Sequence, residues 1–237
     1  MGRLCTYEPE GYVTTTLLQL KTQARQRSDM EGSDFVSDSE LTSYINSSIA
    51  ELHDLLVGTY GPDYFVEKYQ FSTVAGTEDY ALPSNFYKLK GVDALLSGTQ
   101  YYSLRPFNFN ERNRHQDINW SLLAGPSIRY RLVGNNLKFN PAPDAGYSMR
   151  LWFIPTPTPL VLDADIYNDV NSYAEYVIVD AAIKMLQKEE SDVSVLASQK
   201  MDLRKRIENM AANRDADQPE SISDIYADND PFWLTRS

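Results

Sequence analysis

The spacing of apolar residues changes twice along the 237-residue chain, and this change constrains the fold more than any other feature. Near both ends, apolar residues recur at steps of three and four, which is the period of an amphipathic helix. Between them, from about residue 63 to 160, short aromatic and β-branched runs alternate with turn residues, as in strands and hairpins. We therefore predict an α+β fold in which a small antiparallel β domain, 63–160, is inserted into a helical bundle.

The first helical segment, residues 12–62, is predicted to be a helical hairpin. Its first helix should span 13–27, with an apolar stripe formed by Val13, Leu17, Leu20 and Ala24. The second should start at Ser37, because Ser37 and Glu40 have the spacing of a capping box, and should end near Gly58 and Gly61-Pro62. Its stripe consists of Leu41, Ile45, Ile49, Leu52 and Leu56.

Six strands are expected in the β domain. They cover 68–74, 86–96, 99–104, 128–133, 136–140 and 147–154. The clearest hairpin joins 129–133 to 136–139 through Gly134-Asn135, since both residues tolerate the positive φ of a tight turn. Strand ends are marked by Pro141, Pro143, Pro155, Pro157 and Pro159, because proline cannot donate to a β-ladder.

The second helical segment, residues 161–214, should complete the bundle. Helical spacing covers about 168–188, pauses at 189–192 and resumes over 193–210, so the segment is either a hairpin or one kinked helix. The remaining residues, 215–237, carry six acids, two prolines and one basic residue, and we predict an extended acidic tail without a fold of its own. Its apolar residues, Ile222, Ile225, Tyr226, Phe232, Trp233 and Leu234, suggest docking onto another chain.

The net charge of −11 argues against tight DNA binding by the whole surface, because such binding depends on Lys and Arg that displace counterions from phosphates. An aromatic content of 12% suits strands and protein contacts. Cys5 cannot form an intrachain disulfide, and no apolar run approaches the roughly 20 residues that span a bilayer. We expect a soluble protein made in the cytoplasm, without a membrane partner.

Motifs for catalysis or for cofactor binding are not found. His53 lies on the second predicted helix, where it is expected to be a helix-surface or packing residue and not a base, and His115 has no Cys or His near it. The sequence contains no His-Glu-x-x-His, no Cys-x-x-Cys, no phosphate-binding glycine loop and no Gly-x-Ser-x-Gly. Acid pairs such as Glu78-Asp79, or Asp163 with Asp165, are interpreted as turn or cap residues, although a glycosidase pair would look the same in sequence. We predict no enzyme activity, no metal and no cofactor.

One basic cluster stands out in this acidic chain. It consists of Arg105, Arg112, Arg114, Arg129 and Arg131, with His115, against only Glu111 and Asp117 among them. We interpret these arginines as partners for carboxylates of a neighbouring subunit, or as solvated side chains, because arginine suits bidentate carboxylate contacts. The alternative is transient contact with DNA phosphates.

Four phrases in order resemble the head-to-tail connector and adaptor proteins of tailed bacteriophages. They are Tyr80-Ala81-Leu82-Pro83 with Phe86-Tyr87-Lys88-Leu89, Tyr102-Ser103-Leu104-Arg105-Pro106 with Glu111-Arg112-Asn113, Tyr130-Arg131-Leu132 with Gly134-Asn135 and Phe139-Asn140-Pro141-Ala142-Pro143, and Leu151-Trp152-Phe153-Ile154-Pro155. The resemblance covers most of the chain, and in this family the phrases lie between a leading helical hairpin and closing helices.

The resemblance implies a structural virion protein of the neck that forms a twelvefold ring between portal and tail. Helical parts would pack subunit to subunit, the β domain would face the tail, and the C-terminal tail would reach the portal. DNA would pass through the channel with weak contacts only, since an acidic wall repels phosphates. A carbohydrate- or receptor-binding tail module is the alternative, with Tyr101, Tyr102 and Trp120 as sugar platforms; a hydrolase among the carboxylates is a third.

Overall fold

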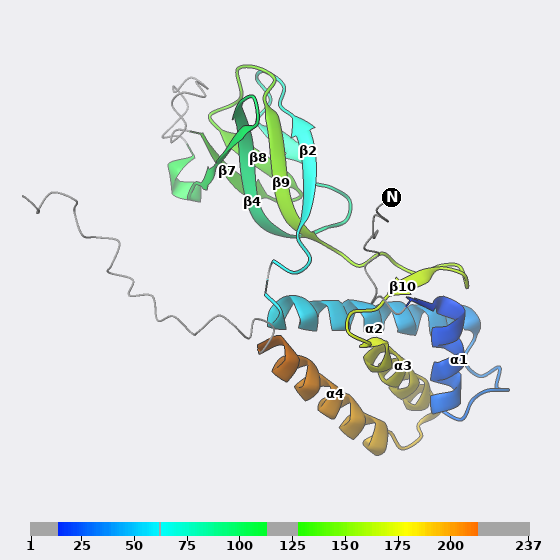
Figure 1. The fold of residues 1–237 in the computed structure, drawn as a ribbon. Helices are drawn as coiled ribbons and strands as arrows, with labels where there is room; N and C mark the ends of the chain where they lie inside the picture. The colour runs from blue at the N-terminus through cyan, green and yellow to red at the C-terminus, as the bar shows by residue number, and fades with distance from the viewer. Residues whose placement is uncertain (1–13, 62, 113–127, 213–237) are drawn as a thin grey trace, which may run out of the picture.

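The computed structural model of the chain describes residues 14–61, 63–112 and 128–212, and these ranges form four α-helices and three β-sheets (Figure 1). The predicted α+β class is confirmed. In chain order the elements are β1 (Thr14–Thr16), α1 (Leu17–Arg27), α2 (Asp38–Thr59), β2 (Glu67–Ser72), β3 (Asp79–Ala81), β4 (Phe86–Ser97), β5 (Gln100–Ser103), β6 (Arg105–Pro106), a 3-10 turn η1 (Phe109–Glu111), β7 (Arg129–Val133), β8 (Asn136–Asn140), β9 (Ser148–Pro155), β10 (Ile166–Asn168), α3 (Ala174–Glu189) and α4 (Ser194–Ala212).

The first helix begins four residues later than its apolar stripe predicts. Thr14–Thr16 form β1, which pairs antiparallel with β10. Three consecutive β-branched residues favour the extended backbone, and Thr16 then caps α1 by accepting from the backbone of Gln19, whose side chain accepts from the backbone of Thr16 in return. The predicted helix from Val13 is therefore wrong at its start, while its end at Arg27 is confirmed.

The second helix begins where its cap predicts. Ser37 Oγ accepts from the backbone N–H of Glu40. The carboxylate of Glu40 instead accepts from Lys188 of α3 and from Tyr44. Glu40, in the first turn of α2, thus ties the start of α2 to the far end of α3.

The closing helical segment consists of two helices, which resolves the choice between a hairpin and a kinked helix. Glu190 adopts a left-handed backbone with φ of 61° and ends α3, and Asp192 then accepts from the backbone N–H of Ser194 at the start of α4. The expected helix start near 168 is wrong, because Asn168 belongs to β10 and the positive φ of Asn171 and Ser172 precedes α3.

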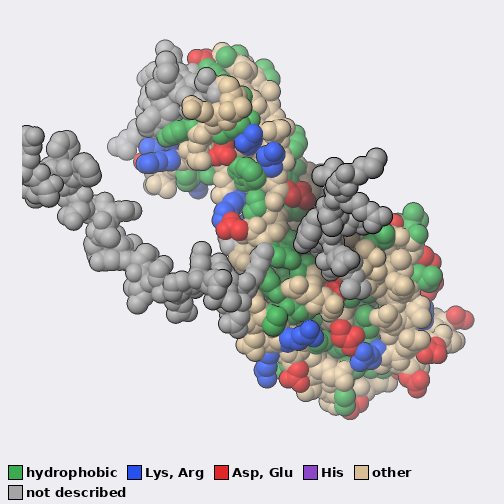
Figure 2. All heavy atoms as spheres, in the orientation of Figure 1, with side chains coloured by type: hydrophobic (Ala, Val, Ile, Leu, Met, Phe, Trp, Pro, Cys, Tyr) green, Lys and Arg blue, Asp and Glu red, His purple; other side chains and the backbone are tan. Residues whose placement is uncertain are grey.

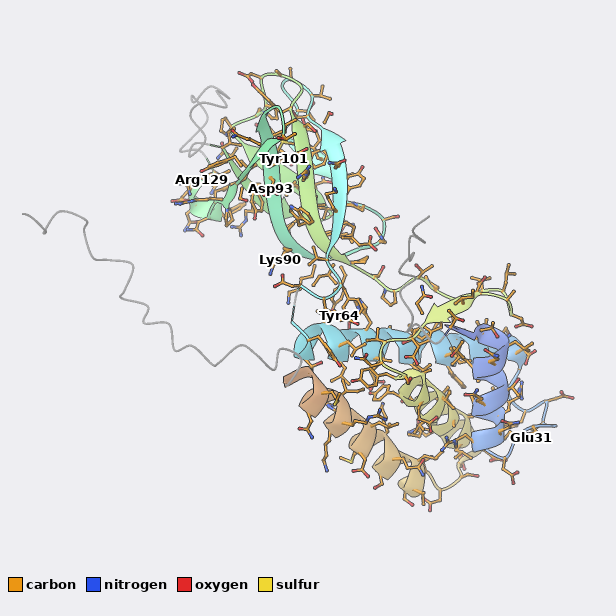
Figure 3. The ribbon with its side chains drawn as sticks, viewed as in Figure 1. Glu31, Tyr64, Lys90, Asp93, Tyr101 and Arg129 are labelled. Carbon is orange, nitrogen blue, oxygen red and sulfur yellow. The ribbon has the colours of Figure 1, made fainter. Side chains whose placement is uncertain are left out.

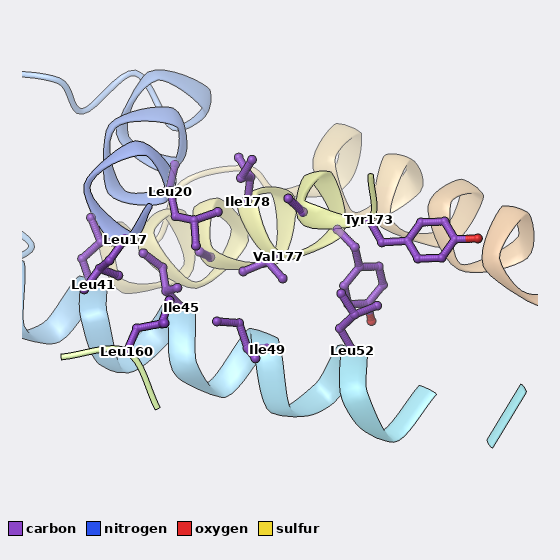
Figure 4. Close-up of a cluster of buried hydrophobic side chains, with 14 of the residues drawn as sticks. Leu17, Leu20, Leu41, Ile45, Ile49, Leu52, Leu160, Tyr173, Val177 and Ile178 are labelled. Carbon is purple, nitrogen blue, oxygen red and sulfur yellow. The ribbon is translucent and has the colours of Figure 1, made fainter. Parts of the chain in front are cut away.

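All four helices contribute to one apolar core (Figure 4). Leu17 and Leu20 of α1 meet Ile45 of α2 and Val177 of α3, and Ile207 of α4 is also buried there. Leu160, which follows the last long strand, completes this core from the connection between the β and helical parts. Helices far apart in sequence are therefore packed into one unit.

The β part holds two four-stranded sheets, in the orders β2-β9-β4-β5 and β3-β8-β7-β6. Its core lies between them, with Val92, Met149 and Leu151 facing Tyr130 and Phe139. The predicted hairpin is confirmed, because β7 and β8 pair up to Val133 and Asn136, and Gly134 supplies a positive φ of 59°. One pairing corrects the expected antiparallel domain: β6 runs parallel to β7.

Asp180 of α3 joins three helices through a buried polar network. Its carboxylate, only 4% exposed, accepts from Ser48 Oγ of α2 at 2.6 Å, and from Lys184 Nζ and Lys200 Nζ at 2.7 Å. Lys200 of α4 also donates to Glu51, which accepts from the Tyr176 hydroxyl. Burial raises the pKa of Asp180, but the bonds from the two lysines and Ser48 outweigh it and hold the pKa below the usual value. The carboxylate is therefore charged and paired at neutral pH.

Replacing Asp180 by Asn should lower the free energy of unfolding by about 2 to 4 kcal/mol, because two partly buried lysines lose their common anion. Urea unfolding measures this. Asp202→Asn is the matched control, since Asp202 and Lys205 lie 4.0 Å apart on the exposed side of α4, and stability should not change measurably. Equal effects of the two substitutions would contradict the structural role of Asp180.

Candidate interaction site

The residues that sequence reasoning tested for chemistry have structural partners. Glu78 and Asp79 flank Lys138, at 2.5 and 3.9 Å. Asp163 pairs with Lys21, while Asp165 accepts from the backbone N–H groups of Val161 and Leu162. Within the described ranges, no three His, Cys, Asp or Glu side chains are placed to hold a metal ion. Cys5, His115 and Trp120 lie outside the described residues.

His53 lies at the junction of the helical and β parts. Its ring is 5.0 Å from the ring of Phe65, in the connection to β2, and 5.5 Å from that of Tyr87 on β4. It also hydrogen bonds to the backbone of Pro155, the last residue of β9. Tyr64, which lies between the two parts in Figure 3, packs edge-on against Phe65. Of the two roles expected from the sequence, helix-surface or packing, His53 has the packing role, and it contacts both connections.

A cavity of about 610 Å³ lies beside this junction. Asn46 and Asp54 of α2 line it together with Asn85, Tyr87 and Pro157. Asp54 accepts a hydrogen bond from the Tyr87 hydroxyl, which joins α2 to β4 across the cavity. Because its walls come from α2 and from the β part, the cavity marks the seam between the two packed parts.

The predicted arginine cluster is largely brought together. Arg105 of β6 and Arg129 of β7 are opposite each other in the sheet, and Arg131 follows two residues along β7, so all three share one face. Tyr130, with the opposite orientation, is buried in the β core. Arg112 follows η1 beside them, and Arg114 lies outside the described residues.

Carbonyls and an aromatic ring hold two of these arginines, Arg112 and Arg131. Arg131 Nη1 donates to the Phe107 carbonyl at 3.1 Å, and Arg112 Nη1 donates to the Phe109 carbonyl at 3.2 Å. Their guanidinium groups approach the exposed Phe109 ring, at 5.7 and 4.7 Å from its centre. Among the residues that the structure describes, none of Arg105, Arg112, Arg129 and Arg131 has a carboxylate within 4.0 Å. Figure 2 shows Lys and Arg side chains beside hydrophobic ones on the β part.

The comparison with protein families matches the SU10 adaptor protein model over residues 15–223. The chain belongs to the SU10 adaptor protein family. The match includes all four helices and both four-stranded sheets. No curated protein is significantly similar to the chain.

Membership in the SU10 adaptor family makes the chain a structural adaptor protein of a phage and a component of the virion. It thereby contacts other head or tail components, and the resemblance seen in the sequence is confirmed. Within the described ranges, no helix has the length and apolar character needed to cross a membrane.

The tyrosines considered for the carbohydrate-binding alternative do not form one platform. Tyr101 is covered on one face by the guanidinium of Arg150, 3.2 Å from its centre, and lies on the outer side of the sheet with Asp93 (Figure 3). Tyr102 has the opposite orientation and packs against the β core. Asp93 also accepts from Trp152 Nε1 at 2.6 Å, so this outer face is occupied by its own contacts.

Sequence reasoning missed two parts of the interaction surface. Phe109 was not singled out, although Arg-Pro-Phe and the spacing of Asn108 and Glu111 indicate a capped turn there, which the structure has. Lys138 of β8 is paired with Arg131 of β7, but from the sequence it is expected only to be part of a strand. Cross-strand register, which brings these residues together, is not visible in the linear pattern.

The junction should make stability depend on pH below about 7. Burial lowers the pKa of His53 despite the Asp54 carboxylate and the Pro155 bond. The unfolded chain, with a His pKa near 6.5, then binds more protons in this window, so the free energy of unfolding should fall as the pH falls. His53→Phe, which keeps a ring between Phe65 and Tyr87, should flatten this dependence in urea titrations, and His115→Phe should not. The same slope in His53→Phe and wild type would exclude His53 as its source.

Proposed function

We propose that the chain is the head-to-tail adaptor of a tailed phage, forming a closed ring of twelve copies between the portal and the tail, with a channel for DNA. The family match over 15–223 is the observation that carries this proposal. It is supported by the four ordered sequence phrases and by helical and β parts that each have their own core. The role is mechanical: the ring joins two partners and provides a face on which the tail docks.

Exposed apolar side chains at two places on the helical part support a ring contact. At one end, Leu18, Val161, Leu162 and Ile166 are 54 to 73% exposed. They lie close together because Leu18 donates to the Asp163 carbonyl and Thr16 pairs with Ile166. On α4, Val195 and Met210 are exposed towards one side of the helix, and Met201 is exposed on the side opposite Met210. A head-to-tail ring requires two different surfaces on each copy, and these two have the apolar content that such contacts need.

The charge distribution suits a channel. Outside residues 63–160 the chain carries 12 Lys or Arg against 25 Asp or Glu, so the surplus of acid lies in the helical and terminal segments. An acidic wall repels the DNA backbone and lets the genome pass without sticking.

The C-terminal tail provides the proposed anchor on the portal, through Ile222, Ile225, Tyr226, Phe232, Trp233 and Leu234, which lie outside the described residues. Buried aromatic side chains dominate interface energies, and three of these six are aromatic. The ring's other partners are the tail or nozzle proteins, which would meet the β part.

Removing residues 215–237 should leave a folded chain that no longer joins the portal of the same phage. Negative-stain images and light scattering of the mixture should show portal-bound rings with the full chain and free portals with the truncation. Alanine at Phe232, Trp233 and Leu234 should reproduce the loss, while alanine at Ser221 and Ser223 should not. Normal capping of the portal by the truncation would disprove the anchoring role, and absence of any complex with the full chain would disprove the adaptor role itself.

A further inference from the structure

The β part has a charge opposite to that of the chain as a whole. Residues 63–160 carry ten Lys or Arg and eight Asp or Glu, a net charge of +2, in a chain of −11. The excess is concentrated on one face, which we term the basic face: Arg105, Arg129 and Arg131 of β6 and β7, with Arg112 and Phe109 of the adjoining turn and Val133 at the end of β7. A surface of this kind attracts an anionic partner.

The basic face also has exposed apolar side chains, which restricts the kind of partner. Val133 lies on the same side of β7 as Arg131, and Phe109 is half exposed between the guanidinium groups of Arg112 and Arg131. Duplex DNA offers phosphates at its surface but no side chain that would cover Phe109 and Val133. An anionic peptide with interspersed apolar residues satisfies both features.

The chain itself contains such a peptide. Residues 221–230 read Ser-Ile-Ser-Asp-Ile-Tyr-Ala-Asp-Asn-Asp, with three acids, three large apolar side chains and no cation. We infer that in the free chain this acidic segment, 221–230, docks on the basic face of the same molecule, its carboxylates on Arg105, Arg112 and Arg131 and its apolar side chains on Phe109 and Val133.

The segment is long enough to reach this face. Its first residue lies nine positions beyond Ala212 and its last lies 18 beyond, so an extended chain can span about 30 to 60 Å from the end of α4. Arg204 and Glu208 of α4 line one pocket with Gly58 and Thr59, which places this end of α4 beside the end of α2, where the chain leaves for the β part. Figure 1 shows the end of α4 and strand β7 on the same side of the molecule.

Docking within one molecule would cover both the basic face and the apolar side chains of the segment 221–230 before assembly. Ile222, Ile225 and Tyr226 belong to the proposed portal anchor, so binding to the portal would withdraw them from the basic face; this consequence, but not the docking, rests on the proposed function. The face would then be exposed only in the assembled ring.

A nitroxide at Ser221→Cys, in a Cys5→Ser background, tests this inference in the full-length chain. The spin label should broaden the amide NMR signals of 105–112 and 129–133. A mixture of spin-labelled and isotope-labelled chains should show no broadening, because the contact lies within one molecule. Salt at 1 M should remove the broadening, since the Debye length falls to about 3 Å.

Three variants separate charge recognition from other causes. Arg105→Glu with Arg131→Glu should abolish the broadening, whereas Lys88→Glu with Lys90→Glu, the same charge change on β4, should keep it. Asp224→Asn, Asp228→Asn and Asp230→Asn together should also abolish it, and they leave the described residues unaltered.

Three results would overturn the inference. They are the absence of broadening in the free chain, broadening that persists in both the arginine and aspartate variants, and broadening seen only in the mixture, which would place the contact between copies. Binding of duplex DNA to the basic face without any tail broadening would identify DNA as the partner instead. These NMR results do not depend on portal binding, so a chain that fails to join the portal can still confirm or contradict the docking of the segment.

Discussion

The carboxylate of Asp180 is the point on which the arrangement of the helices depends. A buried charge is costly unless it is paired, and its three partners come from α2, α3 and α4. Apolar stripes alone tolerate small rotations of one helix against another, because burial is not directional. The bonds from Ser48 and Lys200 to Asp180 fix the orientation of α2 and α4 relative to α3. The apolar core is then packed in one arrangement.

The helical unit in turn positions the β part through α2. His53 and Asp54, adjacent on this helix, contact Phe65 before the first long strand, Tyr87 on β4 and Pro155 at the end of β9. Contacts with both connections and with the central strand resist bending at the junction. A force on one part is therefore transmitted to the other part through these contacts.

The spacing of apolar residues predicted the helices whose buried residues form a regular stripe. It gave wrong boundaries where the local residues favour another backbone conformation than the stripe does. The N-terminal start of α2 was predictable because Ser37 and Glu40 lie within one turn of each other. The start of α1 was not, because Val13 fits the stripe while three threonines favour a strand whose partner, β10, lies 150 residues away. Likewise, the arginines could be recognised as a cluster, but the parallel pairing of Arg105 with Arg129 and the role of Phe109 depend on contacts distant in sequence.

The lysines that hold the helical part and the arginines of the basic face have different partners, and this difference distinguishes the basic face from the rest of the molecule. In the helical part, Lys21, Lys184, Lys188 and Lys200 each pair with a carboxylate. These ion pairs stabilise the fold and neutralise the lysine charges. On the β part, Arg112 and Arg131 are held by carbonyl oxygens and a phenyl ring, which orient a guanidinium without neutralising it. An arginine fixed in this way loses little conformational freedom when an external anion binds, so these side chains are preorganised for recognition.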